Sequence, residues 1–200
     1  MPALPAADVS GATVYAVDAA ASNVAILVYR GGTLARLGHN HVMTSQSVQG
    51  SLWLHPALAR SGFELSFPVD ELVVDDPAAR RAAGSEFPPE IPQADRDGTR
   101  RNMLRAEVLD GANYPTVKLR SVSLTGTQQA PSIITRITIK QISRDVTVPA
   151  TVRIEGSRVT ASGEFDIEQS AFGITPFSIG LGALTVQDRL RVKFRIVAVR

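Results

Sequence analysis

Hydrophobic and polar residues alternate one by one along much of this chain, which is the pattern of a β-strand with one buried face and one solvated face. Residues 188–197 show it most regularly, with basic residues on one parity and apolar residues on the other: Arg189, Arg191, Lys193 and Arg195 against Leu190, Val192, Phe194 and Ile196. A helix would distribute the four cations around its circumference and leave no apolar stripe. The segment therefore predicts a strand.

The same alternation predicts eight further strands, at 23–29, 34–43, 48–54, 63–69, 117–124, 133–142, 146–154 and 159–167. The polar residues 44–47 would form a hairpin turn between the second and third of these. Closing such a sheet into a barrel would hide its edges. We therefore expect an all-β fold, an antiparallel β-barrel of about eight strands. It would be a single domain at 13–200 that follows a flexible N-terminal segment at 1–12.

The alternation stops between Leu72 and Tyr114, where one or two short helices are expected. Asp76 followed by Pro77 is typical of a helix start, because an aspartate side chain caps the free backbone N–H groups and proline suits the first turn. Gly84 is typical of a helix end. A short helix is therefore expected between Pro77 and Gly84.

A second helix is expected from Thr99, whose hydroxyl can cap it, through Met103 and Val108. Residues 86–98 are rich in proline and acidic residues, so they predict an irregular loop. Such a loop, next to a barrel opening, would act as a lid.

The composition argues against several classes of site and function. Hydrophobic residues make up 44% of the 200, and cysteine is absent, so the chain can bury a core but cannot form disulfides or thiolate metal sites. The net charge of +2 does not indicate nucleic-acid binding. No apolar run reaches the roughly 18 residues of a membrane-spanning helix. Residues 2–7 are similar to the segment that follows a removed export signal, and an ordinary flexible terminus explains them equally well.

Gly38-His39-Asn40-His41 is the most conspicuous polar motif. Side chains two residues apart on a strand share a face, so His39 and His41 could bind a metal together. Two ligands are too few, and His55, opposite Arg36 in the expected hairpin, would lie roughly 10 Å from His39. We therefore favour a polar pair near the barrel mouth that contacts backbone or a ligand head group, and keep a metal site as the alternative.

The other polar and glycine-rich features have simpler structural explanations. Asp76 is explained as a helix cap, and its neighbour Asp75 needs only water. The four cations of 188–197, the basic stripe, are expected to be solvated rather than to face anionic lipid. Gly180-Leu181-Gly182 does not open a helix, so phosphate binding is not expected there. The sequence offers no anchor for catalysis, and we do not expect an enzyme.

Four segments follow one another in an informative order: Tyr15-Ala16-Val17-Asp18 with Ala21-Ser22-Asn23-Val24, then 99–109 leading to Asn113-Tyr114-Pro115-Thr116-Val117, then Ile137-Thr138-Ile139 leading to Val146-Thr147-Val148-Pro149, and finally Phe172-Gly173-Ile174. In this order the chain resembles the YceI-like family of lipocalin-like proteins that bind polyisoprenoids and related lipids. Gln141-Ile142-Ser143-Arg144-Asp145 replaces the usual glycine-containing turn, and Gln169-Ser170-Ala171 replaces an Arg-x-Asp-like sequence. The chain therefore resembles a divergent member.

The resemblance implies an extended, lipocalin-like barrel in a periplasmic or otherwise exported protein. It also implies non-catalytic binding or transport of a polyisoprenoid, an isoprenoid quinone or a long-chain amphiphile, without a cofactor. The apolar parity of the strands predicts which side chains line the interior: Phe63, Leu65, Phe67, Val117, Leu119, Ile137, Ile139, Leu190, Val192 and Phe194, with His39 and His41 at the head group. The expected partner is this lipid, and a homodimer and transient contact with a membrane surface stay open.

Overall fold

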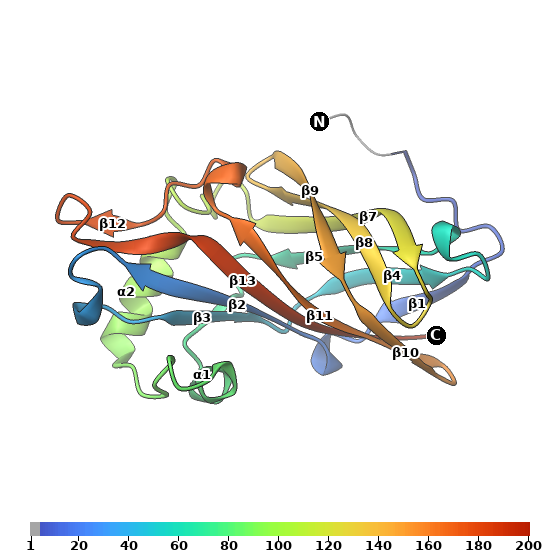
Figure 1. Ribbon diagram of the computed structural model, residues 1–200, viewed down its shortest axis with the longest axis horizontal. Helices are drawn as coiled ribbons and strands as arrows, with labels where there is room; N and C mark the ends of the chain where they lie inside the picture. Colours follow the sequence, from blue (N-terminus) through green and yellow to red (C-terminus); the bar gives the residue numbers. More distant parts are fainter. Residues whose placement is uncertain (1–4) are drawn as a thin grey trace.

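The computed structural model describes residues 5–200, and its strands form one antiparallel sheet that is rolled around an apolar interior (Figure 1). In the described residues the strands are β1 (Thr13–Val17), β2 (Asn23–Gly31), β3 (His41–Ser45), β4 (Gln49–Leu54), β5 (Gly62–Pro68), β6 (Val73–Val74), β7 (Thr116–Gly126), β8 (Pro131–Ile139), β9 (Ile142–Pro149), β10 (Thr151–Glu155), β11 (Arg158–Glu168), β12 (Ser178–Ile179) and β13 (Leu184–Val199). The helices are α1 (Pro77–Ala83) and α2 (Gln93–Met103), with 3-10 turns η1 (Ala19–Ala21), η2 (Ala35–Leu37), η3 (Leu58–Arg60) and η4 (Ser170–Phe172).

The regularly alternating C-terminal segment forms β13, the long strand on which the sheet is organised. One edge of β13 pairs with β2 and then with β1, and the other edge pairs with β11 and β12. From β1 the sheet continues through β4, β5, β7 and β8 to β9, and from β2 it continues through β3 to β6. The predicted strand at 188–197 is therefore confirmed, and it extends by several residues at its N-terminal end.

The expected closed barrel of about eight strands is wrong, because the sheet has 13 strands in the described residues and is not closed. β9 lies beside residues 163–168 of β11 without pairing to them. We call this unpaired boundary between β9 and β11 the seam. The predicted strand at 146–154 is divided between β9 and β10, because the chain bends after Pro149, whose nitrogen carries no hydrogen for a ladder bond. β10 then pairs with residues 158–162 of β11.

The predicted strand at 34–43 is also largely wrong, because β3 begins only at His41. Before it, the Asn40 side chain accepts a hydrogen bond from the Arg30 backbone N–H at 3.0 Å and so takes the place of a ladder partner. Residues 44–47 do not form a hairpin turn either. β3 pairs with β2 and β6, whereas β4 pairs with β1 and β5, so three strands separate them in the sheet.

Helix α1 confirms the expected short helix. The Asp76 carboxylate accepts hydrogen bonds from the backbone N–H groups of Ala78 and Ala79, both at 2.9 Å, and Gly84 ends the helix with a φ of 110°. The helix covers the outer face of β2 and β3, where Leu27, Val42 and Phe87 form a second, smaller core.

Helix α2 differs from the prediction, since it begins at Gln93 and ends at Met103. Thr99 lies inside it rather than capping it, and only the first half of the expected loop at 86–98 is irregular. Pro92 precedes the first turn, and the Gln93 side chain bonds Asp97 one turn later at 2.8 Å. Figure 1 shows α2 across the left end of the rolled sheet. No helix in the described part of the chain is long and apolar enough to cross a membrane.

Candidate functional site

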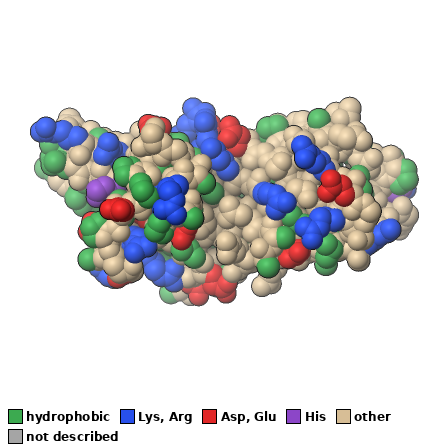
Figure 2. Space-filling view, turned by 90° about the horizontal axis from the view of Figure 1, so that it is seen from below, with side chains coloured by type: hydrophobic (Ala, Val, Ile, Leu, Met, Phe, Trp, Pro, Cys, Tyr) green, Lys and Arg blue, Asp and Glu red, His purple; other side chains and the backbone are tan. Residues whose placement is uncertain are grey.

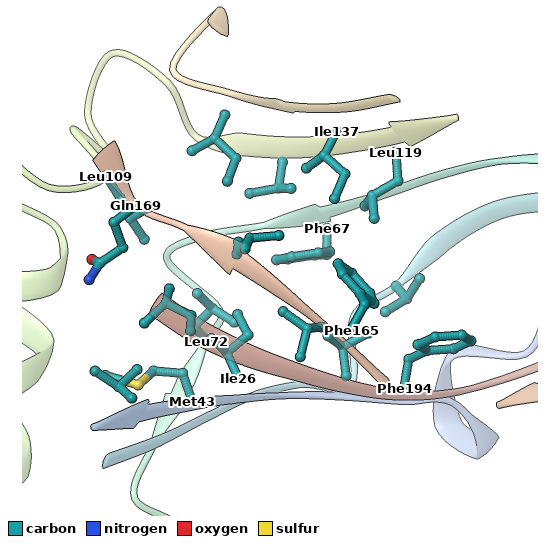
Figure 3. A pocket seen from close by; sticks show the side chains of 18 of the residues that line it. Ile26, Met43, Phe67, Leu72, Leu109, Leu119, Ile137, Phe165, Gln169 and Phe194 are labelled. Atoms are coloured by element: carbon teal, nitrogen blue, oxygen red, sulfur yellow. The ribbon is translucent and has the colours of Figure 1, made fainter. Parts of the chain in front are cut away.

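The rolled sheet encloses a cavity of about 270 Å³. Its wall is formed by inward-facing side chains of β2–β5, β7–β9, β11 and β13, together with side chains of α2 and of the segment after η4. In Figure 3, Ile26, Met43, Phe67, Phe165 and Phe194 point into the same space from different strands. Apart from five polar residues, every residue of the wall is apolar. The interior is therefore suited to an apolar guest.

All ten apolar residues that were predicted to line the interior belong to this wall: Phe63, Leu65, Phe67, Val117, Leu119, Ile137, Ile139, Leu190, Val192 and Phe194. The structure brings them together from β5, β7, β8 and β13. The prediction did not name the inward residues of β2 and β11, among them Ile26, Phe165 and Ile167. Their alternation is visible in the sequence and could have identified them.

The five polar residues of the wall are His41, Thr99, Asn102, Thr135 and Gln169. Thr99 and Asn102 lie on α2, so they mark one end of the cavity as polar. Thr135 lies at the middle of β8 among inward-facing isoleucines. It is 1% exposed, and its hydroxyl has no hydrogen-bond partner among the described residues. A buried hydroxyl without a partner is unusual, because losing its hydrogen bonds to water costs free energy.

His41 is fixed by a buried ion pair behind the cavity wall. Its Nδ1 atom lies 2.6 Å from Oδ2 of Asp75, and the other carboxylate oxygen of Asp75 accepts from Arg80 Nη1 at 2.5 Å. The side chains of Asp75 and Arg80 are both completely buried. With Asp75 ionised, Nδ1 of His41 donates the hydrogen, and no hydrogen bond reaches Nε2 from the described residues.

The surroundings of Asp75 keep it ionised. Burial alone would raise its pKa, but hydrogen bonds from His41, the Val42 amide and Arg80 outweigh burial and hold the pKa below its ordinary value. Arg80 also donates to the Asn40 carbonyl at 2.7 Å and to the Pro88 carbonyl at 2.5 Å. The sequence prediction that Asp75 needs only water is therefore wrong. No sequence signal separates Arg80, which is buried, from its exposed neighbour Arg81.

His39 does not share the position of His41. It precedes β3, its side chain is about half exposed, and its Nε2 atom lies 4.0 Å from Asp95. The two imidazole rings are 6.4 Å apart, and His55 bonds its own loop through the Ala57 amide. Residues 5–200 contain no group of three histidines, cysteines or carboxylates that could hold a metal ion. The alternative of a metal site therefore lacks a third ligand in this part of the chain.

The basic stripe of β13 faces a row of carboxylates on β11. Asp166 accepts hydrogen bonds from both Arg189 and Arg191, and Lys193 lies 4.0 Å from Glu164. Cross-strand pairs of opposite charge stabilise adjacent strands modestly. Two carboxylates therefore pair with three of the four cations, and Arg195 donates instead to the Ala21 carbonyl at 2.8 Å.

The comparisons with known proteins agree with this geometry. The family model of the YceI-like domain matches residues 15–198, which is nearly the whole chain. The chain belongs to the YceI-like family. No curated protein matches its sequence.

Several solved structures share this fold. The chain is similar to BcnA of Burkholderia cenocepacia, with a TM-score of 0.65 and 20% identity over 92% of this chain and 99% of that one. It is similar to a polyisoprenoid binding domain from Saccharophagus degradans, with a TM-score of 0.60 and 12% identity over 92% and 97% of the two chains. A YceI protein of Campylobacter jejuni gives a TM-score of 0.54 and 12% identity over 77% and 81%.

Proposed function

We propose that this YceI-like protein binds one apolar lipid inside the rolled sheet and performs no chemistry on it. The observation that carries the proposal is the cavity of about 270 Å³, whose wall is apolar except for five residues. Each methylene transferred from water into such a space contributes about 0.8 kcal/mol before ordering costs are subtracted. A polyisoprenoid, an isoprenoid quinone or another long-chain amphiphile has the required apolar length, and the polyisoprenoid binding domain of Saccharophagus degradans supports the first of these.

The polar residues suggest how such a guest is oriented. His41, Thr99 and Asn102 would contact its head group at the α2 end, with the free Nε2 atom of His41 accepting a hydrogen bond from a hydroxyl or amide. The tail would extend along the β5, β7 and β8 walls toward Thr135. His39 lies outside the wall of the cavity, so its role as a head-group contact remains a prediction.

Native mass spectrometry of freshly purified protein, followed by organic extraction, tests the proposal. We expect the wild type and the Val14→Trp variant, which changes an exposed position on β1, to carry extractable lipid. Val192→Trp should fill the cavity and abolish the adduct. If Val192→Trp retains the same lipid, or if the wild type carries only metal, the proposal is wrong.

Export and homodimer formation are separate proposals, which rest on the family resemblance and, for export, on residues 2–7, of which 2–4 lie outside the described residues. Cell fractionation of the native protein tests the first, and sedimentation equilibrium tests the second. A cytoplasmic location would contradict export without affecting the lipid proposal.

A further inference from the structure

We propose that the end of the molecule formed by the β12–β13 turn and the loop around η2 docks onto the surface of an anionic lipid bilayer. Four exposed aliphatic side chains gather at this end: Leu34, Leu37, Ile179 and Leu181. We call them the apolar tip. The proposal goes beyond lipid binding in the cavity and does not depend on it.

The two segments that carry the apolar tip are held together as one surface. The Leu34 backbone N–H donates to the Ala183 carbonyl at 2.7 Å. A Cβ atom on Gly32 would lie only 2.5 Å from that carbonyl oxygen, and one on Gly38 would lie 2.8 Å from Leu184. The loop after β2 and the turn before β13 are therefore in close contact, and their exposed side chains belong to the same end.

Leu181 occupies a position that folding does not explain. It is fully exposed at the tip of its turn, between Gly180 and Gly182, and all three residues have left-handed backbones, with a φ of 54° for Leu181. A branched side chain disfavours that conformation, which glycine and asparagine adopt more readily. The leucine therefore disfavours the fold slightly and gains no burial in return. Insertion of the side chain between lipid head groups would provide that burial.

The charges around the apolar tip suit an anionic surface. Residues 169–187 contain no charged side chain, and residues 30–41 contain Arg30 and Arg36 but no carboxylate. Both arginines are exposed, and neither forms an ion pair with a carboxylate in the described residues. In the same segment, His39 lies 4.0 Å from Asp95 of α2. Figure 2 shows hydrophobic and basic side chains together at the left tip of the molecule, with a histidine and acidic side chains next to them.

The basic stripe is a weaker candidate, because Asp166 and Glu164 pair with three of its four cations. An apolar tip flanked by unbalanced arginines is the combination that binds an anionic interface, since apolar insertion and charge attraction add together. A protein partner would require a larger complementary surface than four side chains on two turns supply.

The apolar tip is continuous with the cavity wall. The Val186 N–H donates to the Phe177 carbonyl at 2.9 Å, and both residues line the cavity a few positions from Ile179 and Leu181. α2, with its polar wall residues, lies at the same end in Figure 1. Docking would therefore place this end of the cavity against the bilayer, where an apolar guest could pass without crossing water.

Flotation with vesicles tests the proposal. We expect the full chain to bind vesicles of phosphatidylcholine with phosphatidylglycerol, and to bind much more weakly to phosphatidylcholine alone or at high salt. The Leu37→Asp/Leu181→Asp variant should lower the partition coefficient at least about tenfold. Arg30→Gln and Arg36→Gln should each lower it about fivefold. Ile154→Asp, a matched change at an exposed residue of β10, should have no effect.

Leu181→Gly separates docking from folding, because it keeps the charge and suits the left-handed backbone. It should unfold at the same or a higher temperature and yet bind vesicles more weakly. Val192→Trp should still float with the vesicles, so loss of cavity binding and loss of docking can be distinguished. The proposal is overturned if the wild type does not bind anionic vesicles, if Ile154→Asp weakens binding as much as the tip variant, or if the tip variants abolish a dimer and leave flotation unchanged.

Discussion

The ion pair between Asp75 and Arg80 organises the residues around His41. Both side chains are completely buried, and they are joined to each other, to His41 and to backbone groups of β3. Removing one charge from such a pair leaves the other in a low-dielectric interior without compensation, which is costly. The pair therefore fixes the orientation of His41 and holds α1 against the sheet.

The Asp75→Asn variant should destabilise the protein by about 3 kcal/mol or more, because the Arg80 guanidinium would remain buried without a counter-charge. Urea unfolding followed by circular dichroism measures the change. Asp76→Asn is the matched control one residue away, since asparagine also caps a helix, and it should cost less than about 0.5 kcal/mol. Equal losses in the two variants would contradict the role given to the buried pair.

Asp75 also makes the stability depend on pH. Its pKa in the folded protein lies below the ordinary 3.8, so in acid the unfolded chain binds more protons than the folded chain does. The stabilisation is fully present above the unfolded pKa and is lost as the pH falls through the folded value. The free energy of unfolding should therefore fall more steeply with decreasing pH in the wild type than in Asp75→Asn below about pH 4. Parallel curves would refute this assignment.

The sequence predicted the apolar lining of the cavity better than it predicted the polar residues behind the cavity wall. The ten lining residues were identified because alternation alone divides a strand into two faces, and the apolar face of a rolled sheet turns inward. Asp75 and Arg80 were missed because nothing local distinguishes them from Asp76 and Arg81. Their roles depend on β3 lying against α1, which is a tertiary contact.

For the strands and helices, the alternation predicted where strands run but not how they pair. The expected hairpin at 44–47 failed because neighbours along the chain are here separated by three strands of the sheet. The expected strand at 146–154 failed because alternation continues across Pro149 while the backbone bends. Thr99 was misread as a cap because a threonine at a helix start and one on a helix face look alike in the sequence.

The seam depends on the close approach of β11 to the end of β9. A Cβ atom on Gly163 would lie 2.3 Å from the Pro149 carbonyl oxygen and 2.9 Å from the Phe194 ring. Gly163→Ala should therefore push the two strands apart and lower the free energy of unfolding by about 1–3 kcal/mol. Gly98→Ala, inside α2, should instead raise it by about 0.5–1 kcal/mol, because the added Cβ would meet only the Arg101 side chain, at 3.8 Å. Thermal unfolding of both variants measures the difference in sign, and a neutral Gly163→Ala would contradict the packing argument.

An apolar guest should stabilise the entire fold that encloses it, since a ligand that binds only the folded state shifts the unfolding equilibrium by mass action. Delipidated protein with farnesol as the probe at about a hundred times its dissociation constant should melt roughly 5–10 °C higher. Val192→Trp should show no such increase, because its cavity is filled. An equal increase in both proteins would show that the probe binds elsewhere.

The unpaired seam has a consequence for the range of guests. A sheet that is hydrogen-bonded around its entire circumference has a fixed diameter, because widening it must break a row of hydrogen bonds between two strands. Between β9 and residues 163–168 of β11 there is no such row to break. The interior can therefore swell around a thicker, branched chain and tighten around a slimmer one while the strands on either side keep their partners.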